Sequence, residues 1–382
     1  PDAGATGPDA GGTAGRTADG PAGAAPASEV AGRIGYPVLV KAAGGGGGRG
    51  LRVVRDPAEL EEAVTLASAE AHAAFGDPRV YLERYVERGR HVEVQLLGDG
   101  EHVIHLGDRD CSVQRRYQKL IEEAPAPGLN DDLRARLRAT AVSLGEHLKY
   151  KGAGTVEFLV DAGRGEFYFL EVNARVQVEH PVTEAVTGID IVAEQLAIAE
   201  GRPLRFKQAD VTLAGHAIEV RLNAEDPASD FRPSPGTVTR AVFPAGEDVR
   251  VDTHVQAGAP VPPYYDSLLA KVIARGGDRV SALAALRGAL DRCAVDGVST
   301  NLGLHRALLA DAGFAAGGMD TGYLARWMAR GPLAPAAPGP NAREAPAAVP
   351  DSEPGPGSNA QKALVKAPES ASEPGQGGGR DG

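Results

Sequence analysis

The sequence VLVKAAGGGGGRGLRVV, residues 38–54, places five consecutive glycines between two apolar segments. The valine-rich segments predict two strands, at 38–42 and 51–54, joined by a loop. Five glycines in a row destabilise such a connection, because each loses more backbone entropy on ordering than any other residue. What they permit is close approach of backbone N–H groups to phosphate oxygens. The stretch therefore favours a flap over a nucleotide, with a flexible hairpin as the alternative. It is not a P-loop, because no Lys-Ser/Thr pair follows the glycines.

Outward from this stretch, the pattern alternates between strands and helices. Asp56 is expected to cap a helix that ends near His72, with proline and glutamate in its first turn. Beyond about residue 208 the pattern changes to short strands followed by two helices, which makes this a candidate domain boundary. The expected strands cover 80–86, 91–97, 102–107, 155–160, 166–171, 216–222, 236–243, 249–254 and 268–274, and the other expected helices cover 131–148, 190–200, 279–293 and 301–309.

Composition excludes several classes of protein. The 382 residues carry a formal net charge of −11, whereas binding to nucleic acid or an anionic membrane needs a surplus of Lys and Arg. No run approaches the roughly 18 apolar residues of a membrane helix. Two distant cysteines, Cys111 and Cys293, indicate a reducing compartment, so a cytoplasmic protein is expected. Segments 1–27 and 333–382 are rich in Gly, Ala and Pro and are expected to be disordered.

A pair of glutamates is the second chemical signal. Glu157 and Glu171 each lie seven residues from Arg164, the centre of a predicted hairpin turn, so antiparallel pairing places them nearly opposite each other. Like charges at that separation repel unless a cation or a proton lies between them. Together with the amide oxygen of Asn173 they form an all-oxygen ligand set suited to Mg²⁺ or Mn²⁺. A solvent-facing acidic pair is the alternative.

Two polar segments are further candidates. In segment 173–181 the residues Arg175, Gln177 and Glu179 alternate, so an extended backbone would project them to one side, where they could hold a small anion and supply a base. An ordinary polar strand face would show the same pattern. Segment 108–119 is dense in polar groups and unsuited to a core, which predicts either a solvated loop or a binding loop.

Several segments, taken together and in order, resemble biotin carboxylase, an ATP-grasp ligase. They are KAAGGGGGRG at 41–50, RDCSVQRR at 109–116, EEAPAP at 122–127, EVNARVQVEHP at 171–181, RLNAEDP at 221–227, RPSPG at 232–236 and PPYYDS at 262–267. The resemblance runs from about Val30 to Met328. It implies an α+β fold with an ATP-grasp lid subdomain at 28–86, an ATP-grasp catalytic subdomain at 87–208 and a biotin carboxylase C-terminal domain at 209–332. The family's N-terminal α/β domain is expected to be missing.

The resemblance also implies roles for individual residues. The positions implied for nucleotide binding are Lys41, Gly44, Gly45, Gly46, Gly47, Gly48, Glu83, Val86 (through its backbone), His91 and Gln114. The positions implied for the metal are Glu157, Glu171 and Asn173, and those implied for bicarbonate are Arg175, Gln177 and Val178, with Lys119 nearby. Glu179 matches the general base that deprotonates bicarbonate, and Arg221 matches the cation that stabilises the biotin enolate.

The activity implied by the resemblance is ATP-dependent carboxylation of biotin by bicarbonate, through carboxyphosphate. This is the first half-reaction of acetyl-CoA, propionyl-CoA and methylcrotonyl-CoA carboxylases. The C-terminal segment holds no Met-Lys pair that could accept biotin. Biotin is therefore expected on a separate carrier protein, with carboxyltransferase subunits as further partners and a homodimer as the assembly.

Departures from the family pattern leave two alternatives open. The family's N-terminal domain is expected to be missing, and Tyr117 stands where the family usually has histidine. An inactive truncated remnant that binds nucleotide or a carboxylase partner is one alternative. Another ATP-grasp ligase, such as a carbamoyl-phosphate synthase half, is the second. It would share the glycine loop and the carboxylates, but it would not predict the segment 175–181 or the pair Tyr264-Tyr265.

Overall fold

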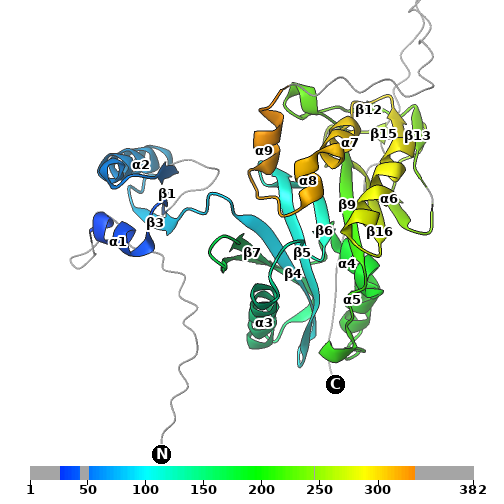
Figure 1. Ribbon diagram of the computed structural model, residues 1–382, viewed down its shortest axis with the longest axis horizontal. Coiled ribbons are helices and arrows are strands. Elements are labelled where there is room, and N and C mark those ends of the chain that lie inside the picture. Colours follow the sequence, from blue (N-terminus) through cyan, green and yellow to red (C-terminus); the bar gives the residue numbers. More distant parts are fainter. Residues whose placement is uncertain (1–25, 44–50, 245, 332–382) are drawn as a thin grey trace, which may run out of the picture. The chain divides into compact units, whose positions relative to one another are not determined.

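The computed structural model describes residues 26–43, 51–244 and 246–331 (Figure 1). The predicted flap, Gly44–Gly48, lies outside the described residues, as do 1–25 and 332–382, which make up almost all of the two segments expected to be disordered. Within the described part of the chain, no helix is both long and apolar enough to cross a membrane.

The N-terminal part, residues 26–86, is a three-stranded antiparallel sheet packed against two helices. Its elements are α1 (Ala27–Ile34), β1 (Val38–Ala42), β2 (Arg52–Val54), α2 (Leu60–Phe75) and β3 (Val80–Arg84). The strand order is β2-β1-β3, so the strands on either side of the glycine run pair directly, as expected. Val38 and Val40, at alternate positions of β1, are buried in one apolar core with Ile34 of α1 and Leu60 and Val64 of α2.

The start of α2 follows the sequence signal at Asp56. The Asp56 side chain accepts a hydrogen bond of 2.9 Å from the Ala58 N–H, and the Glu59 side chain accepts one of 3.5 Å from the Asp56 N–H. This reciprocal arrangement satisfies backbone donors that a helix start leaves unpaired. A short 3₁₀ turn, Pro57–Glu59, leads into the helix.

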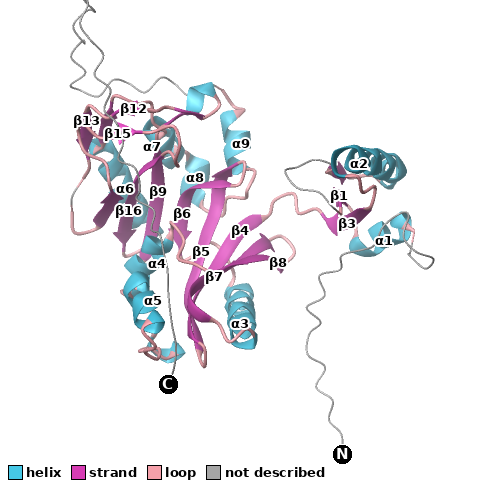
Figure 2. Cartoon of the chain, turned by 180° about the vertical axis from the view of Figure 1, so that it is seen from behind, coloured by secondary structure: helices cyan, strands magenta, loops and turns pink. Residues whose placement is uncertain are grey.

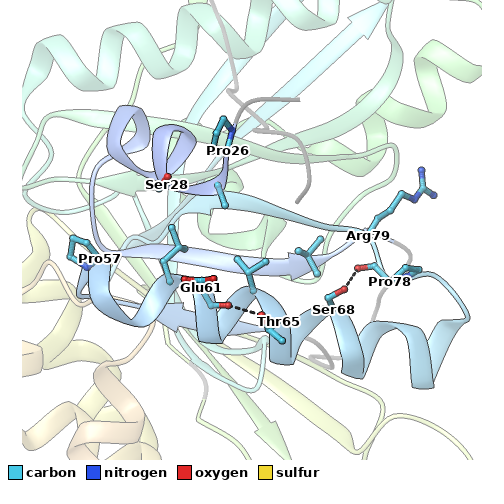
Figure 3. A pocket seen from close by; sticks show the side chains of 12 residues that line it. Pro26, Ser28, Pro57, Glu61, Thr65, Ser68, Pro78 and Arg79 are labelled. Atoms are coloured by element: carbon cyan, nitrogen blue, oxygen red, sulfur yellow. Dashed lines mark hydrogen bonds between the residues drawn. The ribbon is translucent and has the colours of Figure 1, made fainter. Parts of the chain in front are cut away.

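A hollow of about 630 Å³ lies in the N-terminal part, between the start of α1 and one side of α2 (Figure 3). It is lined by residues 26–28 before and in α1, by Pro57 and side chains of α2, and by residues 78–80 at the start of β3. None of the predicted site residues lines it.

The second part is built on an eight-stranded antiparallel sheet with the order β14-β16-β9-β6-β5-β4-β7-β8. The strands are β4 (Arg90–Asp99), β5 (Val103–Arg115), β6 (Gln118–Ala124), β7 (Lys151–Asp161), β8 (Glu166–Asn173), β9 (His216–Asn223), β14 (Val249–Thr253) and β16 (Leu268–Gly276). Strands from both sides of the boundary expected near residue 208 therefore share one sheet.

Helices cover both faces of this sheet (Figure 2). They are α3 (Asp131–His147), α4 (His180–Thr187), α5 (Ile191–Ala199), α6 (Arg279–Arg292) and α7 (Leu302–Ala310). In β4 the even-numbered Val92, Val94 and Leu96 join the core under α3, whereas Leu97 joins the core under α5. Because side chains alternate along a strand, His91, Glu93 and Gln95 face away from α3. We call this side of β4, β5 and β7, with Glu93, Gln95, Arg109, Thr155 and Glu157, the charged face.

Short elements complete the C-terminal region. The strands β10 (Glu225–Asp226) and β11 (Arg232–Pro233), β12 (Gly236–Thr237) and β15 (Pro260–Val261), and β13 (Arg240–Val242) and β17 (Ala294–Asp296) form three small sheets, and the helices α8 (Ala312–Ala316) and α9 (Tyr323–Met328) follow α7. The strand expected at 236–243 is thus two strands, β12 and β13, that pair with different partners. The sequence patterns also missed α1, α4, α8 and α9 and the strands β6, β10, β11, β15 and β17.

Segment 108–119 corrects an expectation. Instead of a loop, it forms most of β5 and the start of β6, and residues 108–114 are buried. Each buried charge has a partner from another element. Asp108 pairs with Arg134 and Arg138 of α3, Arg109 pairs with Glu93, and Asp110 pairs with Arg90. Buried charges are tolerated when they are paired. The partners lie in other parts of the sequence, so the segment by itself did not reveal that it could be buried.

Asp108 is predicted to be the most sensitive of these groups to substitution. Asp108→Ala leaves two arginines and the Ala126 N–H without their common acceptor, so the free energy of unfolding should fall by about 3–5 kcal/mol. Asp132→Ala is the control, since Asp132 is exposed and lies 3.7 Å from Arg136, and it should change stability by no more than about 0.5 kcal/mol. Urea unfolding of the three proteins measures both values. Equal losses for the two variants would contradict the role given to Asp108.

Candidate active site

Lys119 lies at the centre of a cluster of buried carboxylates. Its Nζ is 2.7 Å from Oε2 of Glu93, 2.9 Å from Oε1 of Glu157 and 2.6 Å from Oε1 of Glu179. The four residues come from β6, β4, β7 and the turn before α4. Burial by itself would lower the pKa of Lys119, but the surrounding carboxylates raise it well above its usual value. Lys119 is therefore a permanent cation that allows three negative charges to share one site.

Glu93 is fully buried and is held by a second cation. Arg109 donates from Nε to Oε1 of Glu93 over 2.6 Å, and its other nitrogens donate to Gln95, Thr155, Gln177 and Thr183. Burial favours the neutral acid, yet Arg109 and Lys119 outweigh it and lower the pKa of Glu93 to about 2. Glu93 is thus an anion at neutral pH.

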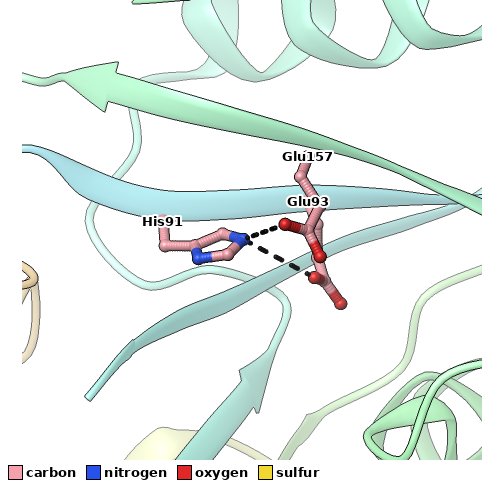
Figure 4. Close-up of side chains that lie close together, drawn as sticks. All are labelled: His91, Glu93 and Glu157. Carbon is pink, nitrogen blue, oxygen red and sulfur yellow. Dashed lines mark ion pairs between the residues drawn. The ribbon is translucent and has the colours of Figure 1, made fainter. Parts of the chain in front are cut away.

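His91 adds a titratable ring to this cluster. Its Nε2 lies 3.0 Å from Oε2 of Glu157 and 3.9 Å from Oε2 of Glu93 (Figure 4). Burial raises the pKa of Glu157, but His91 and Lys119 outweigh that effect and lower it to about 2. The resemblance implies that His91 contacts a nucleotide, and the structure places it beside the predicted metal ligand Glu157.

The predicted metal ligands lie together. Glu157 on β7 pairs directly with Glu171 on β8, as counting from Arg164 indicates. Nδ2 of Asn173 is 3.1 Å from Oε1 of Glu157 and 3.2 Å from Oε1 of Glu171. Glu157 is buried and Glu171 is exposed, so the pair is not simply solvent-facing. In this structure the amide presents its nitrogen to the two carboxylates, while its oxygen Oδ1 accepts a hydrogen bond from Arg175. The residue types, two carboxylates and a side-chain amide, are those that Mg²⁺ or Mn²⁺ prefers.

The segment after Asn173 corrects the expected extended geometry. Residues 174–179 form a turn that leads into α4, so Arg175, Gln177 and Glu179 do not share one strand face. Gln177 and Glu179 are buried, whereas Arg175 is exposed and donates to Oδ1 of Asn173 and to the carbonyl of Val176. The backbone leaves the extended conformation here because α4 starts at His180, with Pro181 in its first turn. Among the described residues, Arg175 bonds to Asn173 and Val176 and not to Glu179.

Glu179 is bonded on both oxygens. Oε1 accepts from Lys119 over 2.6 Å, and Oε2 accepts from Nη2 of Arg221 over 2.9 Å. Arg221, on β9, also donates from Nε to Oε1 of Glu122 over 2.6 Å. The turn is fixed from a third direction by Lys271 of β16, which donates to the carbonyl of Val178 over 2.9 Å. The carboxylate of Glu179 is therefore oriented by two cations and a braced backbone.

The remaining predicted residues divide between the two parts of the chain. Lys41 on β1 and Glu83 on β3 pair over 3.1 Å within the N-terminal part, and Val86 follows β3. Gln114 is buried near the end of β5, where it pairs in register with Lys119. The predicted glycines lie outside the described residues.

Four buried residues of this region have no role in the sequence analysis: Glu93, Arg109, Glu122 and Glu219. Arg109 and Glu122 lie inside segments that carry the family resemblance, yet nothing local to either segment shows that it pairs with a charge on another strand. Glu93 and Glu219 lie on expected strands. The alternation of polar and apolar residues at 91–97 and 216–222 is the signal that would have placed both on the same faces as His91 and Arg221.

Comparison with known proteins identifies the family. A model described as the ATP binding domain of the carbamoyl-phosphate synthase L chain matches residues 13–207, and one described as the biotin carboxylase C-terminal domain matches residues 219–326. Biotin carboxylases of Pseudomonas aeruginosa and of a Nostoc species are 56% and 50% identical, over 77% and 78% of this chain. The chain spans about two thirds of the length of these relatives, 65% and 66% respectively.

Comparison with solved structures identifies the same family. The biotin carboxylase of Campylobacter jejuni, determined as a β,γ-ATP complex, is 47% identical with a TM-score of 0.69, and the match covers 78% of this chain and 67% of that one. A second structure is the biotin carboxylase domain of the 2-oxoglutarate carboxylase of Hydrogenobacter thermophilus, a dimer in complex with MgADP, ADP and bicarbonate. It is 44% identical with a TM-score of 0.69, and the match covers 78% of this chain and 66% of that one. With the C-terminal domain matched as well as the ATP-binding domain, the chain belongs to the biotin carboxylase family.

Proposed function

We propose that this protein carboxylates biotin, with ATP and bicarbonate as the other substrates, as the first half-reaction of an acyl-CoA carboxylase. The observation that carries the proposal is the setting of Glu179. Its carboxylate is buried, is oriented by Lys119 and Arg221, and follows directly on Gln177 and Val178, the positions implied for bicarbonate. The two cations fix the direction of the carboxylate and attract a small anion, so Glu179 is placed to take a proton from that anion.

In the first step Glu179 takes the proton of bicarbonate. Arg175, Gln177, the Val178 backbone and Lys119 hold the anion, so that its oxygen attacks the γ-phosphorus of ATP, ADP leaves, and carboxyphosphate forms. Lys41 and the glycines at 44–48 would bind the phosphates, and Glu83, Val86, His91 and Gln114 would bind the adenosine. A metal ion held by Glu157, Glu171 and Asn173 would supply charge neutralisation at the transferring phosphoryl group.

In the second step carboxyphosphate divides into CO₂ and phosphate. The phosphate accepts the proton of the biotin ureido nitrogen, and that nitrogen then forms the new bond to carbon. Negative charge develops on the ureido oxygen as the proton leaves. Arg221 would stabilise this charge, since its guanidinium is cationic at any working pH.

We also propose partners, an assembly and a location for the enzyme. Biotin would be presented by a separate carboxyl carrier protein, carboxyltransferase subunits would receive the carboxyl group, the assembly would be a homodimer, and the location would be cytoplasmic. The dimer of the Hydrogenobacter domain and the two free, buried cysteines support this picture. We also propose the domain bounds 28–86, 87–208 and 209–332. The interval between the two family models supports the boundary near 208, although strands from both sides of it share one sheet.

The direct test is phosphate release from ATP by the purified chain. The proposal expects release that needs both bicarbonate and biotin, together with incorporation of labelled carbon from bicarbonate into biotin. Omission of biotin or bicarbonate is the control. Tight binding of MgATP in calorimetry, with no phosphate release under any condition, would contradict the enzymatic proposal and favour a protein that only binds nucleotide.

Glu171→Gln is predicted to raise the concentration of Mg²⁺ needed for half-maximal turnover, because it removes one negative charge from the proposed ligand set while keeping the shape of the side chain. Glu166→Gln is the matched control, since Glu166 lies at the start of the same strand, where it accepts from the Tyr168 hydroxyl. Titration of turnover against Mg²⁺ measures the effect. An unchanged requirement in Glu171→Gln would remove this residue from the metal site.

Glu179→Gln is predicted to lower turnover by roughly 10²–10⁴-fold, as expected for loss of a general base, while ATP binding is retained. Glu184→Gln is the control: Glu184 lies on α4, which Glu179 precedes, and pairs with Arg250 over 2.7 Å. Its loss should affect stability but spare turnover. Kinetics and nucleotide titrations of both variants separate the two roles. Full biotin carboxylation by Glu179→Gln with a lowered melting temperature would limit Glu179 to a structural ion pair.

A further inference from the structure

Behind Arg221, two glutamates face each other across neighbouring strands. Glu122 on β6 and Glu219 on β9 are directly paired in the antiparallel register. Both are fully buried, at 0% exposure. Residues directly opposite in such a pair have side chains on the same face, about 5 Å apart at Cβ. Two negative charges at that separation and depth would repel each other strongly.

The hydrogen bonds of the pair compensate only one charge. Oε1 of Glu122 accepts from Arg221, whereas Oε2 of Glu122 and both oxygens of Glu219 are buried without a hydrogen-bond partner. The neighbouring cations are directed elsewhere. Arg221 donates to Glu122 and Glu179, and Lys271 donates to the carbonyl of Val178 and lies 3.2 Å from Asp252. An ionised Glu219 would therefore be a buried charge without direct compensation, which proteins avoid by protonation.

We propose that Glu219 is held as the neutral acid, so that the Glu122–Glu219 pair carries a single negative charge, and that Glu219 is thereby a positioning residue for Arg221. The role of Arg221 rests on the function proposed above; the protonation of the pair does not. Glu219 acts through Glu122. With one charge behind it, the guanidinium bridges Glu122 and Glu179 at 2.6 and 2.9 Å. A second charge, on Glu219, would draw the guanidinium of Arg221 towards the buried pair and away from Glu179.

The charges around the pair are consistent with this state. They are Glu122 and Lys119 from β6, Arg221 from β9 itself, Lys271 from β16 and Glu179 from the turn before α4. Burial, followed by the charge of Glu122, raises the pKa of Glu219 well above its usual range, and the two cations do not offset this. Burial also raises the pKa of Glu122, against the opposing effect of Arg221.

The test compares the full chain with Glu219→Gln, which mimics the neutral acid and cannot ionise. A carboxyl with a raised pKa in the folded protein stabilises that state at low pH, and the contribution is lost as pH rises from about 4.3 to the folded pKa. The ratio of the unfolding constants, wild type to variant, should therefore rise by up to tenfold per pH unit in that interval. A ratio that stays constant between pH 5 and 9 would overturn the proposal.

Glu194→Gln is the matched control, because Glu194 is also buried and has one unpartnered oxygen, but it lies on α5, pairs with Arg205 and is not among the charges that act on the Glu122–Glu219 pair. It should keep the wild-type pH dependence. Infrared spectra at neutral pH give a direct second measurement: the C=O band of a protonated carboxyl should be present in wild type and Glu194→Gln and lost in Glu219→Gln. Its persistence in Glu219→Gln would place the proton elsewhere.

A third measurement addresses positioning and needs no turnover. The side-chain N–H signal of Arg221 in nitrogen NMR, assigned by its loss in Arg221→Lys, should shift as the pair loses its proton at alkaline pH. In Glu219→Gln the signal should not follow that titration. A signal that is constant in wild type while the infrared band disappears would confirm the proton and overturn the positioning role. Absence of biotin carboxylation, with these results as expected, would instead count against the proposed function alone.

Discussion

Three carboxylates that repel one another are brought to one point by a single ammonium group. Glu93, Glu157 and Glu179 come from two strands and a turn, and each lies within 2.9 Å of Nζ of Lys119. Without a cation at this place, burial would force at least one of them to take up a proton or to move towards water. The β5–β6 hairpin, which delivers Lys119, is therefore as much a part of the site as the strands that carry the acids.

The electrostatics extend from this centre in two directions. Arg109 compensates Glu93 on one side, and Arg221 connects Glu179 to the buried pair Glu122 and Glu219 on the other. Cations and anions alternate along this line, so each charge is flanked by the opposite sign until Glu219, where the alternation ends. A charge change at one position alters the protonation or the position of its neighbours, because such groups titrate together.

The sequence predicted correctly those features that depend on residues close together in the chain. The register that opposes Glu157 to Glu171 followed from counting along one hairpin, and the cap at Asp56 from two side chains three residues apart. The burial of segment 108–114 could not be predicted in this way, because it depends on arginines from α3 and on a glutamate from β4. The prediction of an extended backbone around Glu179 was wrong for the same reason: Lys271, which donates to the carbonyl of Val178, is 93 residues away from it in the sequence.

One face of β4 belongs to the apolar core, and the opposite face belongs to the ionic site. Val92, Val94 and Leu96 are packed under α3, and Glu93 and Gln95 between them belong to the charged face. Removal of one residue from this strand would exchange the two sets over the rest of its length, placing carboxylates in the apolar core and valines among the cations. Insertions and deletions in relatives of this protein should therefore be confined to turns such as 162–165, whose length can change without rotating the strands on either side.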